Sequence, residues 1–190
     1  MCEIKEKLQA PFSPFDIEFR IGRSGSNSKG VWATALAYVS NRAIQNRLDE
    51  VFGVMGWKNE YKEWHKDSQL CGISVWDKEK KEWITKWDGA DNTNFESTKG
   101  GLSDSMKRAG YQFGIGRYLY KLEETFVNCE TQRTQDWNYA TLKDKTVFYW
   151  ETPSLPNWAL PKEFQQDKKK SEPKKTENKL IVTGKQVKKA

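Results

Sequence analysis

The stretch from Trp87 to Tyr120, WDGADNTNFESTKGGLSDSMKRAGYQFGIGRYLY, decides how this chain folds and what its surface can bind. Four apolar residues recur at spacings of four, three and four, which predicts a helix with one narrow apolar stripe: Leu102, Met106, Ala109 and Phe113. Lys107, Arg108 and Tyr111 then fall together on the opposite face. Cations neutralise phosphate and an aromatic ring offers a stacking plane, so this face suits a polyanion with exposed flat bases.

The same helix also has a plainer interpretation. Asp104 lies four residues before Arg108, so the arginine could simply complete a surface ion pair on a solvated face. Near the helix start, Gly100 and Gly101 each lower helix propensity by roughly 1 kcal/mol relative to alanine. Such a cost indicates that the backbone there closely approaches either a neighbouring strand or a phosphate.

Charge is distributed unevenly along the 190 residues. The segment from Gln165 onward has nine lysines and three acidic residues, so it accounts for the whole net charge of +6. The rest of the chain has 23 basic and 23 acidic residues, and a nucleic-acid site there must be a local patch. Two segments are rich in basic residues: 20–47, which has no acid, and 99–121, where Asp104 is the only acid.

Alternating and helical patterns predict an α+β domain with an antiparallel sheet and one long helix. Residues 31–39 form the clearest strand, and both of its faces are mostly apolar, which places it centrally or under a subunit contact. Ser40 and Gly53 suit the N-cap and C′ positions of the helix between them. Further strands are predicted at 17–21, 59–64, 70–76, 82–87 and 146–150, with a flexible turn at 23–30 and a hairpin turn at 77–81.

Several classes of protein are disfavoured by the motifs. The three cysteines are widely spaced and imply no disulfide framework, and neither a signal peptide nor a transmembrane run is present, which predicts a cytoplasmic protein without membrane contact. Patterns for zinc, for a nucleotide-binding P-loop and for a dinucleotide fingerprint are also lacking, so no cofactor or metal is expected. The single histidine, His65, is expected on the surface of a strand rather than as a catalytic base.

One enzymatic alternative uses the acids that precede the long helix. Asp88, Asp91 and Glu96, with Lys99 nearby, could build a divalent-metal nuclease site. However, Glu96 and Lys99 are three residues apart, which does not match the usual acid-x-lysine spacing. The preferred interpretation is a turn over 88–94 whose acids stabilise the start of the helix.

Two ordered blocks of sequence resemble a known family. WDGAD (87–91), ESTKGGLSDSMKRA (96–109) and FGIGRYLY (113–120) form one block, and AYVSNRAIQNRLDEVFGVMGW (37–57) forms the other. Together they resemble Sak-type phage single-strand annealing proteins, of the family of the eukaryotic Rad-fifty-two annealing protein, over roughly residues 19–122. The resemblance implies a β-β-β-α core, ring-shaped homo-oligomers and no enzymatic activity.

The resemblance also implies which residues contact DNA. Lys107 and Arg108 match the basic pair on the family's DNA-contacting helix, and Arg20 matches an arginine on an early strand. Tyr111 stands where eukaryotic members have a further basic residue, and a stacking tyrosine could substitute for it. From the two basic segments we add three candidates: Lys99, Arg117 and Arg42.

The resulting functional prediction is a homo-oligomer that binds single-stranded DNA and anneals complementary strands without ATP, in recombination or repair, encoded by a phage and acting in its bacterial host. Two alternatives remain open: the metal-dependent nuclease and a double-stranded RNA-binding module. Residues 1–164 are predicted to form the annealing domain. Residues 165–190 are predicted to be a disordered basic tail that attracts DNA, docks the host single-strand-binding protein or only aids solubility.

Overall fold

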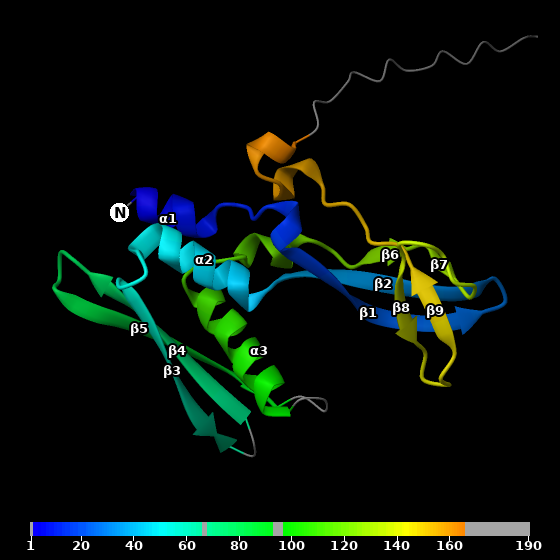
Figure 1. Ribbon diagram of the computed structural model, residues 1–190, viewed down its shortest axis with the longest axis horizontal. Coiled ribbons are helices and arrows are strands. Elements are labelled where there is room, and N and C mark those ends of the chain that lie inside the picture. The colour runs from blue at the N-terminus through cyan, green and yellow to red at the C-terminus, as the bar shows by residue number, and fades with distance from the viewer. Residues whose placement is uncertain (1, 66–67, 93–96, 166–190) are drawn as a thin grey trace, which may run out of the picture.

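The computed structural model describes residues 2–65, 68–92 and 97–165, and within these ranges the chain is α+β, as the sequence predicts (Figure 1). The predicted tail lies outside the described residues except for Gln165. The helices and strands are, in chain order, α1 (Cys2–Gln9), β1 (Ile17–Asn27), β2 (Gly30–Val39), α2 (Asn41–Phe52), β3 (Trp57–Trp64), β4 (Ser68–Asp77), β5 (Glu82–Asp91), α3 (Ser97–Gln112), β6 (Thr125–Val127), β7 (Cys129–Glu130), β8 (Asn138–Thr141) and β9 (Val147–Trp150). Short 3-10 helices are η1 (Pro14–Asp16), η3 (Arg117–Lys121), η4 (Asn157–Ala159) and η5 (Lys162–Phe164).

The strands do not form one sheet. In the described part of the chain they divide into three antiparallel sheets with strand orders β1-β2-β6, β3-β4-β5 and β7-β9-β8. β2 is the middle strand of its sheet, as expected from its two apolar faces. α3 packs on β4 and β5, and Figure 1 shows it between the β3-β4-β5 sheet and the β1–β2 hairpin.

The predicted flexible turn over residues 23–30 is wrong. β1 continues to Asn27, and its backbone pairs with β2 as far as the Asn27–Gly30 pair. The register shifts between Ile21 and Arg23, so Gly22 is the extra residue of a bulge. The polar, glycine-rich composition of this stretch resembles a loop, but an edge strand needs only backbone partners, which β2 supplies.

α2 has the caps that the sequence predicts. The Ser40 hydroxyl accepts a hydrogen bond from the backbone N–H of Ala43, and Gly53 ends the helix at a φ of 77°. The buried Arg47 in its middle donates to the carbonyls of Lys7 and Ala10, each at 2.8 Å, and to Pro11 at 3.3 Å. This arginine therefore fixes the end of α1 onto α2.

The β4–β5 hairpin and α3 follow the predicted order, with one difference in detail. The middle of the predicted apolar stripe is buried, with Met106 1% exposed and Ala109 fully buried. Leu102 is half-buried, as is Phe113, directly after the end of α3. The turn predicted over 88–94 is wrong at its start, because β5 extends to Asp91, which pairs with Ser68 of β4. A Cβ on Gly101 would meet Oδ1 of Asn92, directly after β5, and would lie 2.9 Å from Cγ of Gln69 on β4. The close approach there is therefore to the β4–β5 hairpin.

The main hydrophobic core is shared by α2, α3, β4 and η3, and includes Ile44, Leu48, Ile73, Met106 and Leu119. A second cluster lies where β2 meets β9. The tryptophans of the β4–β5 hairpin are not in either core. Trp76 and Trp83 are 38% and 41% exposed and pack edge to face at 5.5 Å.

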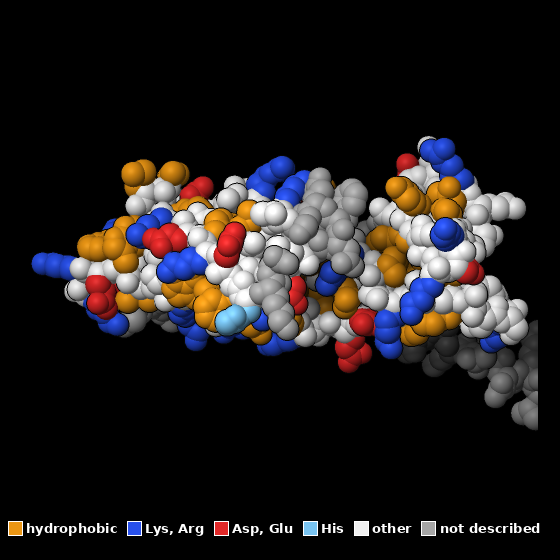
Figure 2. Space-filling model, turned by 90° about the horizontal axis from the view of Figure 1, so that it is seen from below, with side chains coloured by type: hydrophobic (Ala, Val, Ile, Leu, Met, Phe, Trp, Pro, Cys, Tyr) orange, Lys and Arg blue, Asp and Glu red, His pale blue; other side chains and the backbone are white. Residues whose placement is uncertain are grey.

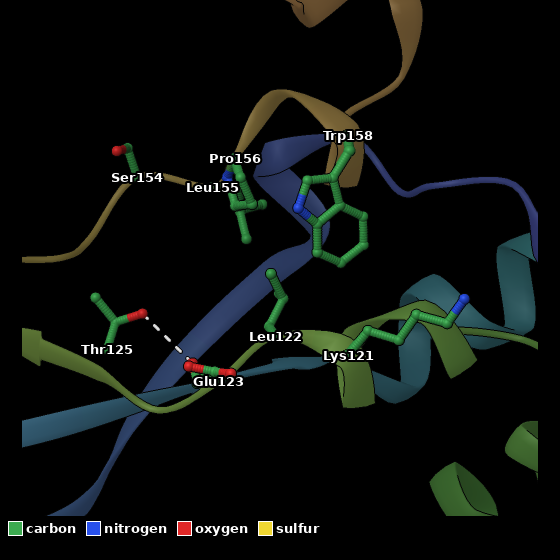
Figure 3. A pocket seen from close by; sticks show the side chains of 8 residues that line it. All are labelled: Lys121, Leu122, Glu123, Thr125, Ser154, Leu155, Pro156 and Trp158. Carbon is green, nitrogen blue, oxygen red and sulfur yellow. Dashed lines mark hydrogen bonds between the residues drawn. The ribbon is translucent and has the colours of Figure 1, made fainter.

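The chain finally returns across the domain as a proline-rich segment. Trp158 of η4 packs edge to face on Tyr118, with ring centroids 6.5 Å apart. Figure 3 shows Trp158, Leu155 and Leu122 pointing toward one another around a shallow pocket of about 440 Å³. The predicted strand 146–150 is present as β9.

Candidate nucleic-acid interface

A groove of about 1070 Å³ runs between α3 and the face of the β1–β2 hairpin. One wall comes from β1 and β2, and the other comes from α3 together with neighbouring ends of β3, β4 and β5. Leu119 and Tyr120 of η3 also line the groove. Among the predicted DNA-binding residues, four line this groove: Arg20, Lys107, Arg108 and Tyr111. The fold thus brings Arg20 next to a helix about ninety residues later in the chain, which sequence spacing alone could not establish.

Lys107 projects from α3 toward β2. Its Nζ lies 3.2 Å from Oδ1 of Asp104 and 5.0 Å from the ring centroid of Tyr38. The lysine side chain is 26% exposed, so a ligand in the groove can still reach it. The cation is therefore held between a carboxylate and the face of an aromatic ring.

Arg108 has a different partner from the one predicted. Its Nε donates to Oδ1 of Asp88 at 2.8 Å, whereas Asp104 pairs with Lys107. Burial raises the pKa of the Asp88 carboxyl, but hydrogen bonds from Gln112, Arg108 and the Gly89 backbone more than offset that, so its pKa is lowered. The ion pair crosses from β5 to α3 and orients the guanidinium, which remains 55% exposed.

Arg20 and Tyr38 belong to the opposite wall. Arg20 pairs with Leu36 in the β1–β2 ladder, so its side chain shares a face with Leu36 and Tyr38. Burial, with a further contribution from a hydrogen bond to Glu18, raises the pKa of Tyr38 to about 12. The phenol is therefore neutral at physiological pH and presents an aromatic wall with a polar tip.

Tyr111 and Arg117 meet at the η3 end of the groove. The Arg117 Nη2 donates to the carbonyl of Tyr111 at 2.7 Å and to that of Gln112 at 3.2 Å, so it satisfies the last carbonyls of α3. The same guanidinium lies 4.9 Å from the centroid of the Tyr111 ring, and Tyr120 contacts that ring from a centroid distance of 4.5 Å. Arg117 is thus engaged in capping the helix.

The remaining candidates lie elsewhere. Arg42 is exposed in the first turn of α2, and Lys99 is exposed in the first turn of α3. Neither is among the residues that line the groove. Arg23, in the same basic segment as Arg20, is bound to Glu124 at 2.7 Å.

The groove has no large excess of positive charge. Its lining has three cations, Arg20, Lys107 and Arg108, and two carboxylates, Asp91 and Asp104. The face of the molecule in Figure 2 likewise mixes blue and red side chains with orange ones, without a region of one sign. This agrees with the equal numbers of acidic and basic residues in the first 164 residues.

The acids considered for a nuclease site do not form one cluster among the described residues. Asp88 accepts hydrogen bonds from Arg108 and Gln112, Asp91 lies at the exposed end of β5, and Glu96 falls outside the described residues. Over residues 2–65, 68–92 and 97–165 no group of three His, Cys, Asp or Glu side chains is placed to hold a metal ion. None of the helices in these ranges is long and apolar enough to span a bilayer.

Sequence reasoning did not predict that Tyr38 and Tyr120 line this groove, or that Asp88 pairs with Arg108. Tyr38 belongs to one side of a two-faced strand, and its alternation with Leu36 is the signal that could have found it. Tyr120 follows Arg117 by three residues, which is the repeat of a 3-10 helix, but nothing in the sequence indicates that helix type. The carboxylate that pairs with Arg108 is 20 residues away and emerges only from the packing of α3 on β5.

Comparison with known proteins identifies a family and two relatives. The model of the Rad52/22 family of double-strand break repair proteins matches residues 1–81 and 70–138. The chain is 29% identical over 167 residues to the single-stranded DNA-binding protein DdrA of Deinococcus radiodurans, covering 85% of this chain and 69% of that protein. It is 30% identical over 163 residues to the single-stranded DNA-binding protein DdrA of Deinococcus deserti, covering 85% of this chain and 72% of that protein. The chain belongs to the Rad52/22 family, as its sequence motifs indicate.

Proposed function

We propose that this protein binds single-stranded DNA in the groove between α3 and the β1–β2 hairpin and anneals complementary strands without ATP. The observation that carries the proposal is the convergence of Arg20, Lys107 and Arg108, from two distant segments, beside the ring of Tyr111. Membership of the Rad52/22 family and likeness to two proteins named as single-stranded DNA-binding support it. It would act in the recombination or repair of DNA, in a bacterial cytoplasm and on behalf of a phage.

The geometry supports binding through the phosphate backbone. Lys107 and Arg108 are adjacent on one face of α3, with carboxylates as their present partners. An incoming phosphate would either displace those carboxylates or share each cation with them, because part of each cation is exposed. Because the contacts are to the backbone, base edges remain free to pair with a complementary strand.

Annealing needs no chemical step from this groove. The protein raises the local concentration of strands, cancels part of their repulsion and keeps bases apart from intrastrand structure. These effects are equilibrium binding effects and require neither nucleotide hydrolysis nor a metal. We therefore propose a non-catalytic role for the chain.

The simplest test is annealing of complementary labelled oligonucleotides by the full chain in EDTA without nucleotide. We expect faster duplex formation than in the absence of protein, and intact strands when magnesium is added. Shortened strands in magnesium would instead support the nuclease alternative. Preferential competition by duplex RNA over single-stranded DNA would support the RNA-binding alternative.

We also propose that the protein forms a closed homo-oligomer. At the β4–β5 hairpin Trp76 and Trp83 are partly exposed, and the nearby Met55 is 90% exposed. Phe126 of β6, on the other side of α3, is 73% exposed. Two apolar surfaces on different sides of one chain suit a head-to-tail contact that closes into a ring. Light scattering without DNA should give a multiple of 22.1 kDa at micromolar concentration, and the mass of one chain would contradict this.

The basic residues from 165 onward have a proposed auxiliary role. Nine lysines would attract DNA non-specifically or dock an acidic segment of the host single-strand-binding protein. A chain truncated after Phe164 should then anneal naked strands normally but lose activity on strands precoated with that host protein. If both activities are unchanged, only a solubilising role remains, and loss on naked strands would make the tail part of the annealing machinery.

A further inference from the structure

We infer that Tyr120 is the residue on which a nucleobase stacks at the η3 end of the groove, with Tyr111 and Arg117 as its support. This rests on the proposed function, because it assigns a base-binding position within the same groove. Tyr120 lines the groove and is 73% exposed, and no sequence pattern assigns it a role. Tyr111, the residue expected to stack on bases, is already in contact with two other side chains.

The local backbone explains how these groups come together. α3 ends near Gln112, and Gly114 and Gly116 both adopt positive φ, at 94° and 66°, which side chains rarely allow. A Cβ on Gly114 would also lie 2.9 Å from Cγ of Gln9, so this turn admits little else. The two glycines lead the chain from α3 into η3, and Tyr120 of η3 contacts Tyr111 in the last turn of α3.

The 3-10 geometry then selects which side chains face Tyr111. Residues three apart in a 3-10 helix project from the same side, and Arg117 and Tyr120 are three apart. Both contact the Tyr111 ring: the Arg117 guanidinium lies 4.9 Å from its centroid and the Tyr120 ring 4.5 Å from it. Arg117 is itself fixed by its hydrogen bonds to the α3 carbonyls.

The consequence is a preorganised aromatic platform. Tyr111 is half-buried and braced, whereas Tyr120, as the outermost member, retains most of its surface. A ring held by neighbours loses little side-chain freedom when a base stacks on it, which favours binding. Because every base has a flat face, such a platform is tolerant of sequence, as a protein that anneals arbitrary strands requires. Lys107 and Arg108 line the same groove, so a strand could place phosphates on the cations and a base on Tyr120.

The test compares Tyr120→Leu and Tyr120→Phe in the full chain with Tyr139→Leu as the matched control. Tyr139, on β8, is 75% exposed and lies outside the groove. Each variant is titrated with a mixed-sequence oligonucleotide and with an abasic oligomer of equal length, which keeps the phosphates and lacks the bases. We expect Tyr120→Leu to weaken binding of the base-bearing strand by about 5- to 100-fold, and to leave abasic binding unchanged. Tyr120→Phe and Tyr139→Leu should bind both like the wild type.

Quenching of 2-aminopurine within the strand is a second readout, because a base stacked on an aromatic ring is quenched. Tyr120→Leu should reduce this quenching at saturating protein. If Tyr120→Leu loses equal affinity for the base-bearing and abasic strands, or loses none for either, the assignment to Tyr120 is wrong while the proposed function stands. If the wild-type chain binds neither strand, both the proposed function and this inference are wrong.

Discussion

The two basic segments of this chain look alike in sequence and behave differently in the fold. Residues 20–47 have five cations and no acid, but of these only Arg20 lines the groove. Arg47 is buried against the end of α1, and Arg23 is bound to Glu124. Residues 99–121 have an acid among them, yet Lys107 and Arg108 both line the groove. A run of like charge therefore does not identify a binding surface. The element that presents each cation decides its role.

The largest expected effect comes from reversing the two α3 cations. Lys107→Glu with Arg108→Glu should weaken single-stranded DNA binding by about 100-fold or more and abolish annealing, because two phosphate contacts become repulsions. The log–log salt dependence should flatten by about 1.4, or about 0.7 for each of the two phosphates no longer neutralised. Fluorescence anisotropy over a salt series measures both quantities.

The matched control for that variant is Lys78→Glu with Lys80→Glu. It makes the same change in net charge at the exposed β4–β5 turn, away from the groove. If the control loses as much affinity, net charge rather than the groove governs binding. A folded α3 variant with unchanged affinity and salt slope would refute the site.

The second effect concerns stability rather than binding. Arg47→Met removes a buried cation that donates to three backbone carbonyls, which leaves those carbonyls without their partner. We expect about 2–4 kcal/mol lower free energy of unfolding, measured in urea, and an unchanged salt slope for DNA binding by the folded fraction. Arg23→Met, which loses only the exposed pair with Glu124, should cost about 1 kcal/mol or less. If the two variants lose the same free energy of unfolding, the buried position of Arg47 does not make it more important for stability than Arg23.

A third, smaller effect should go in the opposite direction. Asp104→Asn removes a carboxylate that lines the groove and pairs with Lys107, so single-stranded DNA should bind about 3- to 10-fold tighter at low salt. The gain should shrink as ionic strength rises, because screening reduces the repulsion that was removed. Glu79→Gln at the exposed hairpin turn is the control and should have little effect. Weaker binding by Asp104→Asn would mean that the carboxylate positions Lys107 for DNA.

The smallest effect separates two arginines of one segment. Arg20→Ala should weaken binding several-fold because Arg20 lines the groove, whereas Arg42→Ala should change it less than about 2-fold. Both variants remove one positive charge from the acid-free segment 20–47, so each is the control for the other. If the two variants lose the same affinity, the total charge of the segment, and not the groove, governs binding.

Local patterns predicted much of the fold. The strand at 31–39, the caps of α2, the β4–β5 hairpin and the apolar stripe of α3 all follow from side-chain periodicity and from residues with strong backbone preferences. The second half of β1 did not, because Ser, Gly and Asn pair through their backbones there and leave no apolar alternation to detect. Division of the strands into three sheets depends on long-range pairing, which spacing does not encode.

The composition of the candidate groove was predictable to a similar extent. Lys107, Arg108 and Tyr111 share a helix face that simple geometry reveals, and all three line the groove. The family motif points to Lys107 and Arg108. The partners of those residues come from other elements: Asp88 from β5, Tyr38 from β2. The electrostatic state of the groove therefore emerges only from tertiary packing, and it is closer to neutral than the helix alone suggests.

The carboxylate partners of Lys107 and Arg108 have a kinetic consequence. If DNA binds as proposed, Asp104 or Asp88 replaces each phosphate that leaves Lys107 or Arg108, so release does not leave a bare charge in the groove. In the proposed complex, exchange of one anion for another avoids the cost of a bare cation, so it lowers the barrier to stepping from one nucleotide to the next. A strand held in this way can shift its register many times while it remains bound. Searching for complementarity requires this combination of retention and mobility.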